Sequence, residues 1–282
     1  MVYDRVRWEE KALLEEAKAR GINAKFIDAK LLILDHQQNG DEVRKEVGDI
    51  ILQRCISHFR GLHITAFLEG KGLRVINSYE VSEKCGNKLL TTSLLLKAGV
   101  ATPRTKVCFS PEAALKAIND LGYPVVLKPV VGSWGRLVIA IKDREMAQAI
   151  IEMKSQMEGL FSQIYYLQEM VQRPPRDIRS IVAGDNLVTA VYRYAPPDDW
   201  RTNVAVGGKT VSCPITSELR EIVLKVAEAV GGGVLGVDLM EGPDGLVVHE
   251  VNPTVEFKGA ASASTANIPK AIIDYVVRLA RR

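Results

Sequence analysis

Residues 234–252 read VLGVDLMEGPDGLVVHEVN, two apolar stretches on either side of a Gly-Pro-Asp-Gly turn. Runs rich in β-branched residues around such a turn predict a β-hairpin. If the turn is centred on Asp244, the two residue numbers of every cross-strand pair add up to 488. Asp238 then lies opposite Glu250, with the two Cβ atoms about 5 Å apart.

Asn252 lies on the same face of this hairpin as Glu250, because side chains alternate between the two faces of a strand. Two facing carboxylates repel each other unless a cation lies between them. Together with the Asn252 carbonyl, the Asp238 and Glu250 oxygens form a hard, all-oxygen site that suits Mg²⁺ bound beside phosphates. The alternative is a polar strand face exposed to solvent, and the apolar neighbours are compatible with both interpretations.

The rest of the chain alternates helix and strand signals, which is typical of an α/β fold. Helices are predicted at 8–20, 61–69, 78–98 with a break near Gly86, 110–121, 143–157, 217–230 and 268–280. Strands are predicted at 24–27, 49–55, 74–77, 105–109, 123–129, 137–141, 165–171 and in the hairpins 177–194 and 234–252. We expect residues 1–85 to form a small βαβ unit with a truncated first strand, because only Val2 and Tyr3 precede polar residues.

A second group of polar residues follows the strand that ends in VVLKP, residues 125–129. Lys128 closes this apolar strand, where burying an ammonium is costly unless an anion pairs with it. The Gly-rich loop 132–136 (GSWGR) connects two strands, so it is not a Walker A loop, and no GxGxxG motif is present. Such a loop can still fold over phosphates and donate backbone N–H groups. The alternative is an ordinary hairpin turn with a snorkelling lysine.

Several other polar residues are ambiguous when taken singly. Lys88 lies at a break in a predicted helix, and is either a second phosphate-binding cation or an exposed helix lysine. Gln168 and Glu169 suit either an adenine and ribose contact or a simple strand end. Arg193 and the arginines of RPPRDIRS and WRTNVAVGG can hold carboxylates or phosphates bidentately, although for each alone a surface position is the commoner case. The four histidines share no spacing, and we interpret them as surface or packing residues.

Composition excludes several classes of protein. The 282 residues include 37 Lys+Arg against 34 Asp+Glu, and a net charge of +3 is too small to indicate a nucleic-acid partner. No apolar run of about 18 residues indicates a membrane span, and the charged start MVYDRVRWEEK does not resemble a signal peptide. The four cysteines have no CxxC spacing, which disfavours zinc and disulfides. We therefore expect a cytoplasmic α/β enzyme without a membrane or nucleic-acid partner.

The order of the motifs is informative as a set. A lysine after CGN, then VVLKP, the Gly-rich loop, QE, DIR, RTNVAVGG, Asp238 and EVN follow one another along the chain. This order resembles that of the ATP-grasp ligases of the RimK-like branch, and GSWGRL, RDIR, AEAVGGGVLGVDL and NPTVEFKG are similar to the LysX and ArgX group within that branch. The resemblance covers essentially the whole chain. It implies an α/β ATP-grasp fold, with a pre-ATP-grasp βαβ domain at 1–85, an ATP-grasp domain at 86–282 and a lid-like ATP subdomain at 100–170.

The resemblance also implies a role for each matching position. The positions implied to bind ATP are Lys88, Lys128, Gly132, Ser133, Trp134, Gly135, Arg136, Gln168, Glu169, Val171, Asp177, Arg179 and Asn203. Those implied to bind substrate are Arg193, Val204, Gly207, Gly208, Glu256, Phe257, Lys258, Gly259, Ala260 and Asn267. Mg²⁺ or Mn²⁺ is implied at Asp238, Glu250 and Asn252, and the acyl phosphate is implied to form beside the catalytic Arg193 and Asn203.

The implied activity is carboxylate–amine ligation driven by ATP. ATP phosphorylates the side chain of the C-terminal glutamate of an acidic carrier protein, LysW, and the amino group of α-aminoadipate attacks the acyl phosphate. Loops 132–136 and 196–209 are expected to act as lids, because an acyl phosphate hydrolyses when water reaches it. A homo-oligomer, dimer or tetramer, is implied as well.

The resemblance leaves the substrate amino acid open. LysX-type members carry Asn and then Ser or Thr after EFK, and ArgX-type members carry Gly-Phe, whereas this chain has Gly259-Ala260. A small pair leaves room for a longer side chain, but one methylene contributes only about 1–3 kcal/mol to discrimination. The alternatives are a glutamate–LysW ligase, dual specificity, a RimK-like protein glutamate ligase, or a nucleotide-binding regulatory protein. The joint presence of both lysines and all three metal ligands disfavours the last.

Overall fold

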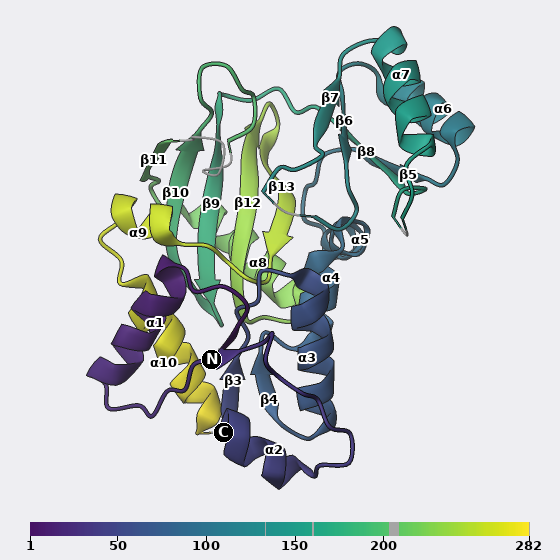
Figure 1. The fold of residues 1–282 in the computed structure, drawn as a ribbon. Coiled ribbons are helices and arrows are strands. Elements are labelled where there is room, and N and C mark those ends of the chain that lie inside the picture. The colour runs from purple at the N-terminus through teal and green to yellow at the C-terminus, as the bar shows by residue number, and fades with distance from the viewer. Residues whose placement is uncertain (133, 160, 203–208, 282) are drawn as a thin grey trace.

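The computed structural model describes residues 1–132, 134–159, 161–202 and 209–281. Figure 1 shows an N-terminal α/β region, a small sheet covered by two helices, and a larger central sheet. This arrangement confirms the predicted α/β class. None of the helices in the described part of the chain has the length and apolar character needed to span a membrane.

The N-terminal region is built from short parallel strands and helices. Its elements are β1 (Val2–Tyr3), α1 (Trp8–Ala19), β2 (Ile27–Asp28), α2 (Gly40–Val47), β3 (Ile50–Leu52), α3 (His58–Gly70) and β4 (Arg74–Ile76). Strand β1 pairs with β2 and β3 with β4, and a bridge from Val2 to Gln53 connects the two pairs. Val2 is fully buried, so the described chain does form a first strand, although a short one. Helix α2 was not predicted from the sequence, although a capping box between Asn39 and Glu42 marks its start.

Two helices lead from this region into the small sheet. Helix α4 (Tyr79–Gly86) ends and α5 (Lys88–Lys97) begins at the predicted break, where Asn87 accepts the backbone N–H of Leu89. The small sheet has the strand order β5-β8-β6-β7. Its elements are β5 (Thr105–Cys108), α6 (Pro111–Leu121), β6 (Val125–Lys128), β7 (Ile139–Ile141), α7 (Arg144–Ser155) and β8 (Tyr165–Glu169). Ser110 caps α6, as the Ser-Pro pair predicts.

The central sheet carries most of the polar residues singled out from the sequence. Its strands run in the order β11-β10-β9-β12-β13 and are antiparallel. They are β9 (Arg176–Ala183), β10 (Asn186–Tyr194), β11 (Lys209–Ser212), β12 (Val234–Gly242) and β13 (Gly245–Asn252). Helix α8 (Ser217–Val230) packs on one face through residues such as Val223 and Val226. Helices α1 and α10 (Ile268–Ala280) cover one end of the other face, where Ile272 joins a core that includes Ile181.

Two short elements lie in segments for which the sequence predicted neither a helix nor a strand. Strand β11 pairs with β10 at the edge of the central sheet, and α9 (Lys258–Ala263) lies beside it. Both are brief, and their positions depend on contacts with distant parts of the chain. Local sequence patterns therefore carry little information about them.

The predicted pairing of Asp238 with Glu250 is confirmed, although the turn is not centred as assumed. Next to the turn, Leu239 pairs with Val248, and the two numbers sum to 487. A β-bulge then shifts the register by one residue, with His249 as the extra residue, so that Asp238 pairs with Glu250. The bulge therefore brings the two carboxylates to opposing positions.

Candidate active site

Charged residues of β9, β10 and β12 form a buried network on the open face of the central sheet. Arg193 donates to Asp177 from Nε (2.8 Å to Oδ1) and from Nη2 (2.6 Å to Oδ2). Its Nη2 also lies 3.2 Å from Asp238 Oδ2, and Arg179 binds Asp238 through Nε and Nη2. Burial would raise the pKa of Asp177, but Arg193 outweighs it and holds that pKa well below its usual range. The surface interpretation of Arg193 is therefore wrong, since it is buried and fixed between two carboxylates.

Glu250 and Lys88 meet at the edge of this network. Lys88 is the first residue of α5, and its Nζ lies 3.1 Å from Glu250 Oε1 and donates to the Gly132 carbonyl at 2.9 Å. Burial would raise the pKa of Glu250, but Lys88, His249 and Lys128 outweigh it and lower the pKa to about 2. Lys88 is buried, so its interpretation as an exposed helix lysine is wrong.

Lys128 ends β6 as a buried cation whose Nζ donates to Gln168 Oε1 at 2.6 Å. Burial lowers the pKa of Lys128 to about 8; the charge of Glu250 opposes this shift, and that of Lys88 adds to it. Gln168 in turn donates from Nε2 to Thr105 Oγ1 at 3.0 Å. A buried ammonium whose hydrogen-bond partner is neutral is suited to receive an anion, which favours the phosphate interpretation over a snorkelling lysine.

Two adjoining cavities meet at this cluster. The larger, about 650 Å³, is lined by residues of the N-terminal region, the Gly-rich loop and the central sheet. The smaller, about 60 Å³, has the charged lining residues Lys88, Lys128, Arg136, Arg173, Asp177, Arg193, Arg201 and Glu250. Gly132, Arg193 and Glu250 line both cavities. These three residues mark the place where ligands of the two cavities would come into contact.

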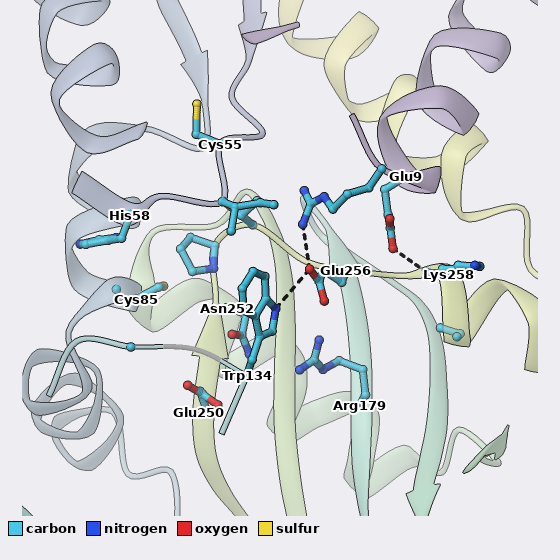
Figure 2. Close-up of a pocket in the computed structure, with 18 of the residues that line it drawn as sticks. Glu9, Cys55, His58, Cys85, Trp134, Arg179, Glu250, Asn252, Glu256 and Lys258 are labelled. Carbon is cyan, nitrogen blue, oxygen red and sulfur yellow. Dashed lines mark hydrogen bonds and ion pairs between the residues drawn. The ribbon is translucent and has the colours of Figure 1, made fainter. Parts of the chain in front are cut away.

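The Gly-rich loop lies over this junction. Trp134 donates its indole N–H to Glu256 Oε1 at 3.2 Å. On the side of the smaller cavity, Arg201 donates to the Gly135 carbonyl at 3.2 Å. Figure 2 shows the Trp134 ring inside the larger cavity, between Glu250 and Glu256. The loop therefore contributes a side chain to one cavity and a backbone carbonyl to the rim of the other.

The far end of the larger cavity is formed by the N-terminal segment and α9. Glu9 is buried and accepts the backbone N–H groups of Phe257 (3.1 Å) and Lys258 (3.0 Å), which fixes the start of α9. Gly259 and Ala260 line the cavity from the first turn of this helix. Phe257 itself is fully buried in the core. The predicted substrate segment therefore lies at the cavity, with Phe257 serving as a packing residue.

Some predicted site residues are not brought to the two cavities. Asn267 caps α10 by accepting the backbone N–H of Lys270 at 3.0 Å, and it lines a separate surface hollow. Glu169 accepts from the backbone (2.8 Å) and the side chain (2.6 Å) of Arg104. Neither Glu169 nor Val171 lines the larger or the smaller cavity. The predictions for Ser133, Asn203, Val204, Gly207 and Gly208 fall outside the described residues.

Several residues that line the two cavities were not predicted from the sequence. Trp8 was predicted only as the first residue of a helix and no role was predicted for Arg7, yet both line the larger cavity. His249 was interpreted as a surface or packing residue, but it lines the smaller cavity, and its buried Nε2 makes no hydrogen bond to the described residues and lies 3.8 Å from Asp177 Oδ2. Burial lowers the pKa of His249, although Asp177 opposes the shift. No sequence signal marks these residues, because long-range packing and the bulge place them.

The donor atoms of the predicted magnesium ligands decide whether these residues fit the ion. No three His, Cys, Asp or Glu side chains cluster as a metal site among the described residues. The predicted set instead combines two facing carboxylates, Asp238 and Glu250, with Asn252, whose Nδ2 donates to Asp238 Oδ2 at 3.3 Å. Carboxylate and amide oxygens suit Mg²⁺, which usually takes one or two carboxylates and completes its shell with phosphates and water. The residues therefore fit a magnesium ion that binds together with a nucleotide.

Comparison with known proteins defines the class of this chain. Residues 85–276 match the RimK-like ATP-grasp domain, and residues 1–84 match the LysX preATP-grasp domain. The chain therefore belongs to the RimK-like ATP-grasp family and is an ATP-dependent ligase, as the order of its motifs predicted.

Individual relatives narrow the class further. The alpha-aminoadipate–LysW ligase LysX of Sulfurisphaera tokodaii is 37% identical and covers 97% of this chain and 95% of its own length. The glutamate–LysW ligase ArgX of the same organism is also 37% identical, covering 98% of this chain and 96% of its own length. Among solved structures, the RimK domain ATP-grasp protein of Sphaerobacter thermophilus has a TM-score of 0.81 at 25% identity, covering 98% of this chain and 99% of its own. The ATP-grasp ligase PsnB, solved with Mg and ADP, shares the fold at 20% identity (TM-score 0.76; 99% of this chain, 97% of its own).

Proposed function

We propose that this chain activates the C-terminal glutamate of the carrier protein LysW and joins it to the amino group of α-aminoadipate in lysine biosynthesis. The observation that carries the proposal is the junction of two cavities at Gly132, Arg193 and Glu250. A nucleotide in the basic smaller cavity presents its γ-phosphate there, and a carboxylate in the larger cavity approaches the same point. The likeness to LysX over nearly the whole chain supports the identity of the substrates.

The first step is phosphoryl transfer. An oxygen of the carrier's carboxylate bonds to the γ-phosphorus, the bond from that phosphorus to the β,γ-bridging oxygen breaks, and ADP leaves. Lys88, Lys128 and Arg193 hold the phosphate oxygens, because such a reaction depends mainly on positioning and charge stabilisation. Asp238, Glu250 and Asn252 would hold Mg²⁺ (or Mn²⁺), which would supply further positive charge to offset that of the phosphates.

The second step is amide formation. The neutral amino group of α-aminoadipate attacks the acyl carbon and the C–N bond forms. The bond from the acyl carbon to the phosphate oxygen breaks, inorganic phosphate leaves, and the nitrogen loses one proton. The larger cavity suits a dicarboxylate amino acid, since its basic lining residues Arg7, Arg179 and Lys258 are distributed around it. Glu9, in the same lining, offsets part of this charge and suits the cationic end of an amino acid.

The second candidate substrate is glutamate. ArgX is as similar to this chain as LysX, at 37% identity, and Gly259-Ala260 places two small residues at the cavity wall. A cavity that accepts the longer amino acid excludes the shorter one only weakly, so dual specificity is the natural alternative.

The test is incubation of the protein with LysW, Mg-ATP and either amino acid, followed by mass spectrometry of LysW. We expect a mass gain with α-aminoadipate. A gain with glutamate alone would overturn the aminoadipate assignment, and a gain with both would establish dual specificity. ADP release should depend on both carrier and amino acid, and a protein that never releases ADP would be a nucleotide-binding regulator instead.

The assembly and location complete the proposal. We propose a cytoplasmic homo-oligomer, dimer or tetramer, in keeping with the family resemblance and with four cysteines that are all free thiols. Light scattering at working concentration measures the oligomeric state, and a monomer at that concentration would contradict it.

A further inference from the structure

Glu256 joins three segments that are distant in the sequence. Its Oε1 accepts the indole N–H of Trp134 at 3.2 Å and the Nη1 of Arg7 at 2.8 Å. The first contact spans 122 residues and the second 249 residues of sequence. Figure 2 shows the Glu256 carboxylate with a dashed contact to the Trp134 ring. The Gly-rich loop is thus tied to the N-terminal region through one carboxylate.

The Arg7 side of this connection is rigid. Arg7 donates to Glu10 from Nε (3.0 Å) and Nη2 (2.7 Å), and Glu10 is fully buried and also accepts from Arg54 at 3.0 Å. The Glu256 side chain is 40% exposed, so it is held by its partners rather than by burial. Trp134 has a φ of +61°, in the left-handed region that L-residues adopt at a cost in free energy. A loop in such a conformation needs contacts to keep it there, and the bond to Glu256 is one.

Two further contacts, made by Gly132 and Gly135 of the loop, lie on the nucleotide side. Lys88 donates to the Gly132 carbonyl at 2.9 Å, and Arg201 donates to the Gly135 carbonyl at 3.2 Å. When ATP is bound, its phosphates compete with the loop carbonyls for these two cations. The bond between Trp134 and Glu256 lies in the larger cavity, away from that competition. It is therefore the contact that can hold the loop closed while the acyl phosphate exists.

We propose that Glu256 is a positioning residue that latches the Gly-rich loop through Trp134 and so keeps water from the acyl phosphate. The proposal rests on the proposed function. It adds a residue that holds the loop in place and takes no part in the chemical steps. When the latch opens, water attacks the acyl carbon, the bond from that carbon to the phosphate oxygen breaks, and phosphate leaves. The carrier's carboxylate is regenerated, one ATP is consumed, and no amide forms. The latch thus determines how many ADP molecules are released per amide.

The experiment measures ADP and amide product in the same reaction for Trp134→Phe, Glu256→Ala and Glu256→Gln. The wild-type ratio of ADP to amide should be near one. Loss of one hydrogen bond should raise the excess of ADP over amide, expressed per amide formed, about fivefold in Trp134→Phe and Glu256→Ala. Glu256→Gln keeps an oxygen acceptor for the indole and should show a smaller rise. The double variant Trp134→Phe/Glu256→Ala should show no more than either single variant, because both remove the same bond.

Tyr123→Phe is the matched control, since it also removes one hydrogen bond, which Tyr123 donates to Asn119 Oδ1 at 3.3 Å, and Tyr123 lines neither cavity. Its ratio should stay near one. Variants that lower amide formation and ADP release equally, with the ratio unchanged, would show an ordinary binding or structural role and overturn the latch. A rise in the double variant that equals the combined rises of the two single variants would overturn the latch as well.

A second measurement separates failure of the latch from failure of the proposed function. In a Trp8→Phe/Trp200→Phe background, Trp134 is the remaining tryptophan. Acrylamide should quench its fluorescence about twofold more strongly after Glu256→Ala, in the presence of Mg-ADP and without any carrier. Unchanged quenching refutes the latch whatever the substrate is. If the wild-type protein modifies LysW with neither amino acid, the proposed function fails, and the quenching result still decides whether the loop is latched.

Discussion

The two adjoining cavities differ in size and in what fills them. The larger, about 650 Å³, lies within the range of about 300–1,000 Å³ that is usual for small-molecule sites. The smaller, about 60 Å³, is far below that range, and several of its charged side chains are bonded to one another or to the loop above. Lys88 pairs with Glu250, Arg193 pairs with Asp177, and Arg201 bonds Gly135.

With the proposed assignment of the two cavities, this difference predicts a substrate side that is already formed and a nucleotide side that opens when its ligand arrives. The cations of the smaller cavity have internal partners, which phosphate oxygens would replace. A nucleotide replaces carbonyl and carboxylate oxygens with phosphate oxygens, so each cation exchanges one partner for another and is not left bare. The substitutions below test this contrast, beginning at the wall that both cavities share.

Glu250→Gln should have the largest effect, a loss of about 100-fold or more in the rate of ADP release. Glu250 contributes to both cavities, and its carboxylate is both a proposed Mg²⁺ ligand and the partner of Lys88. The amide keeps the shape but removes the charge. Initial rates with saturating Mg-ATP, LysW and amino acid measure the loss.

The matched control for Glu250→Gln is Glu241→Gln, on the other strand of the same hairpin. Glu241 forms an ion pair with Arg176 (2.7 and 2.9 Å) and lines neither cavity. It should keep the wild-type rate, and both variants should keep the wild-type circular dichroism spectrum. Full activity in Glu250→Gln would refute its role at the junction.

The sequence predicted the elements that have strong local signals. Ser110-Pro111 marks the start of α6, and the hairpin of β12 and β13 follows from its turn and its β-branched runs. Strand β11 and helix α9 were missed because they are short and are positioned by tertiary contacts. Helix α2 was missed although its capping box was readable at Asn39.

The candidate site was predictable only in part, and for a related reason. The pairing of Asp238 with Glu250 was correct because the bulge at His249 compensated for a turn placed half a residue away from its true centre. A bulge has no reliable sequence signature, so the place of His249 beside Asp177 could not be foreseen. Arg7 reaches the larger cavity only because α1 packs against α10 and the segment before α9, a long-range arrangement.

A second test uses pH to examine the nucleotide side alone. The pKa of Lys128 is about 8 in the free protein, and the charged groups that act on it are Glu250, Lys88, Asp238 and Arg173. Its ordinary value is 10.5, so the ammonium is lost from the free protein as pH rises through about 8, and it is fully present below that pH. The kcat/KM for ATP should therefore be flat below pH 8 and should fall about tenfold per unit above it.

Lys128→Arg is the control for this profile, because a guanidinium stays charged throughout the range. Its kcat/KM should be lower overall, because the side chain is longer, but the fall above pH 8 should be absent. The kcat/KM for the amino acid, measured at saturating ATP, should lack this fall in both proteins. An identical decline for Lys128→Arg would assign the titration to another group.

The smallest expected effect concerns the preformed substrate side. Gly259→Val adds two methyl groups and the carbon that bears them at the wall of the larger cavity, in the first turn of α9. This added volume should penalise α-aminoadipate more than glutamate, because the former is longer by one methylene. A difference of about 1–3 kcal/mol corresponds to a change of about 10-fold to 200-fold in the ratio of the two kcat/KM values, and we expect the lower end. Ser262→Val, an exposed position on the same helix, should leave the ratio unchanged. Equal losses for both amino acids in Gly259→Val would mean that the distal end of the substrate does not reach α9, and that the cavity discriminates elsewhere.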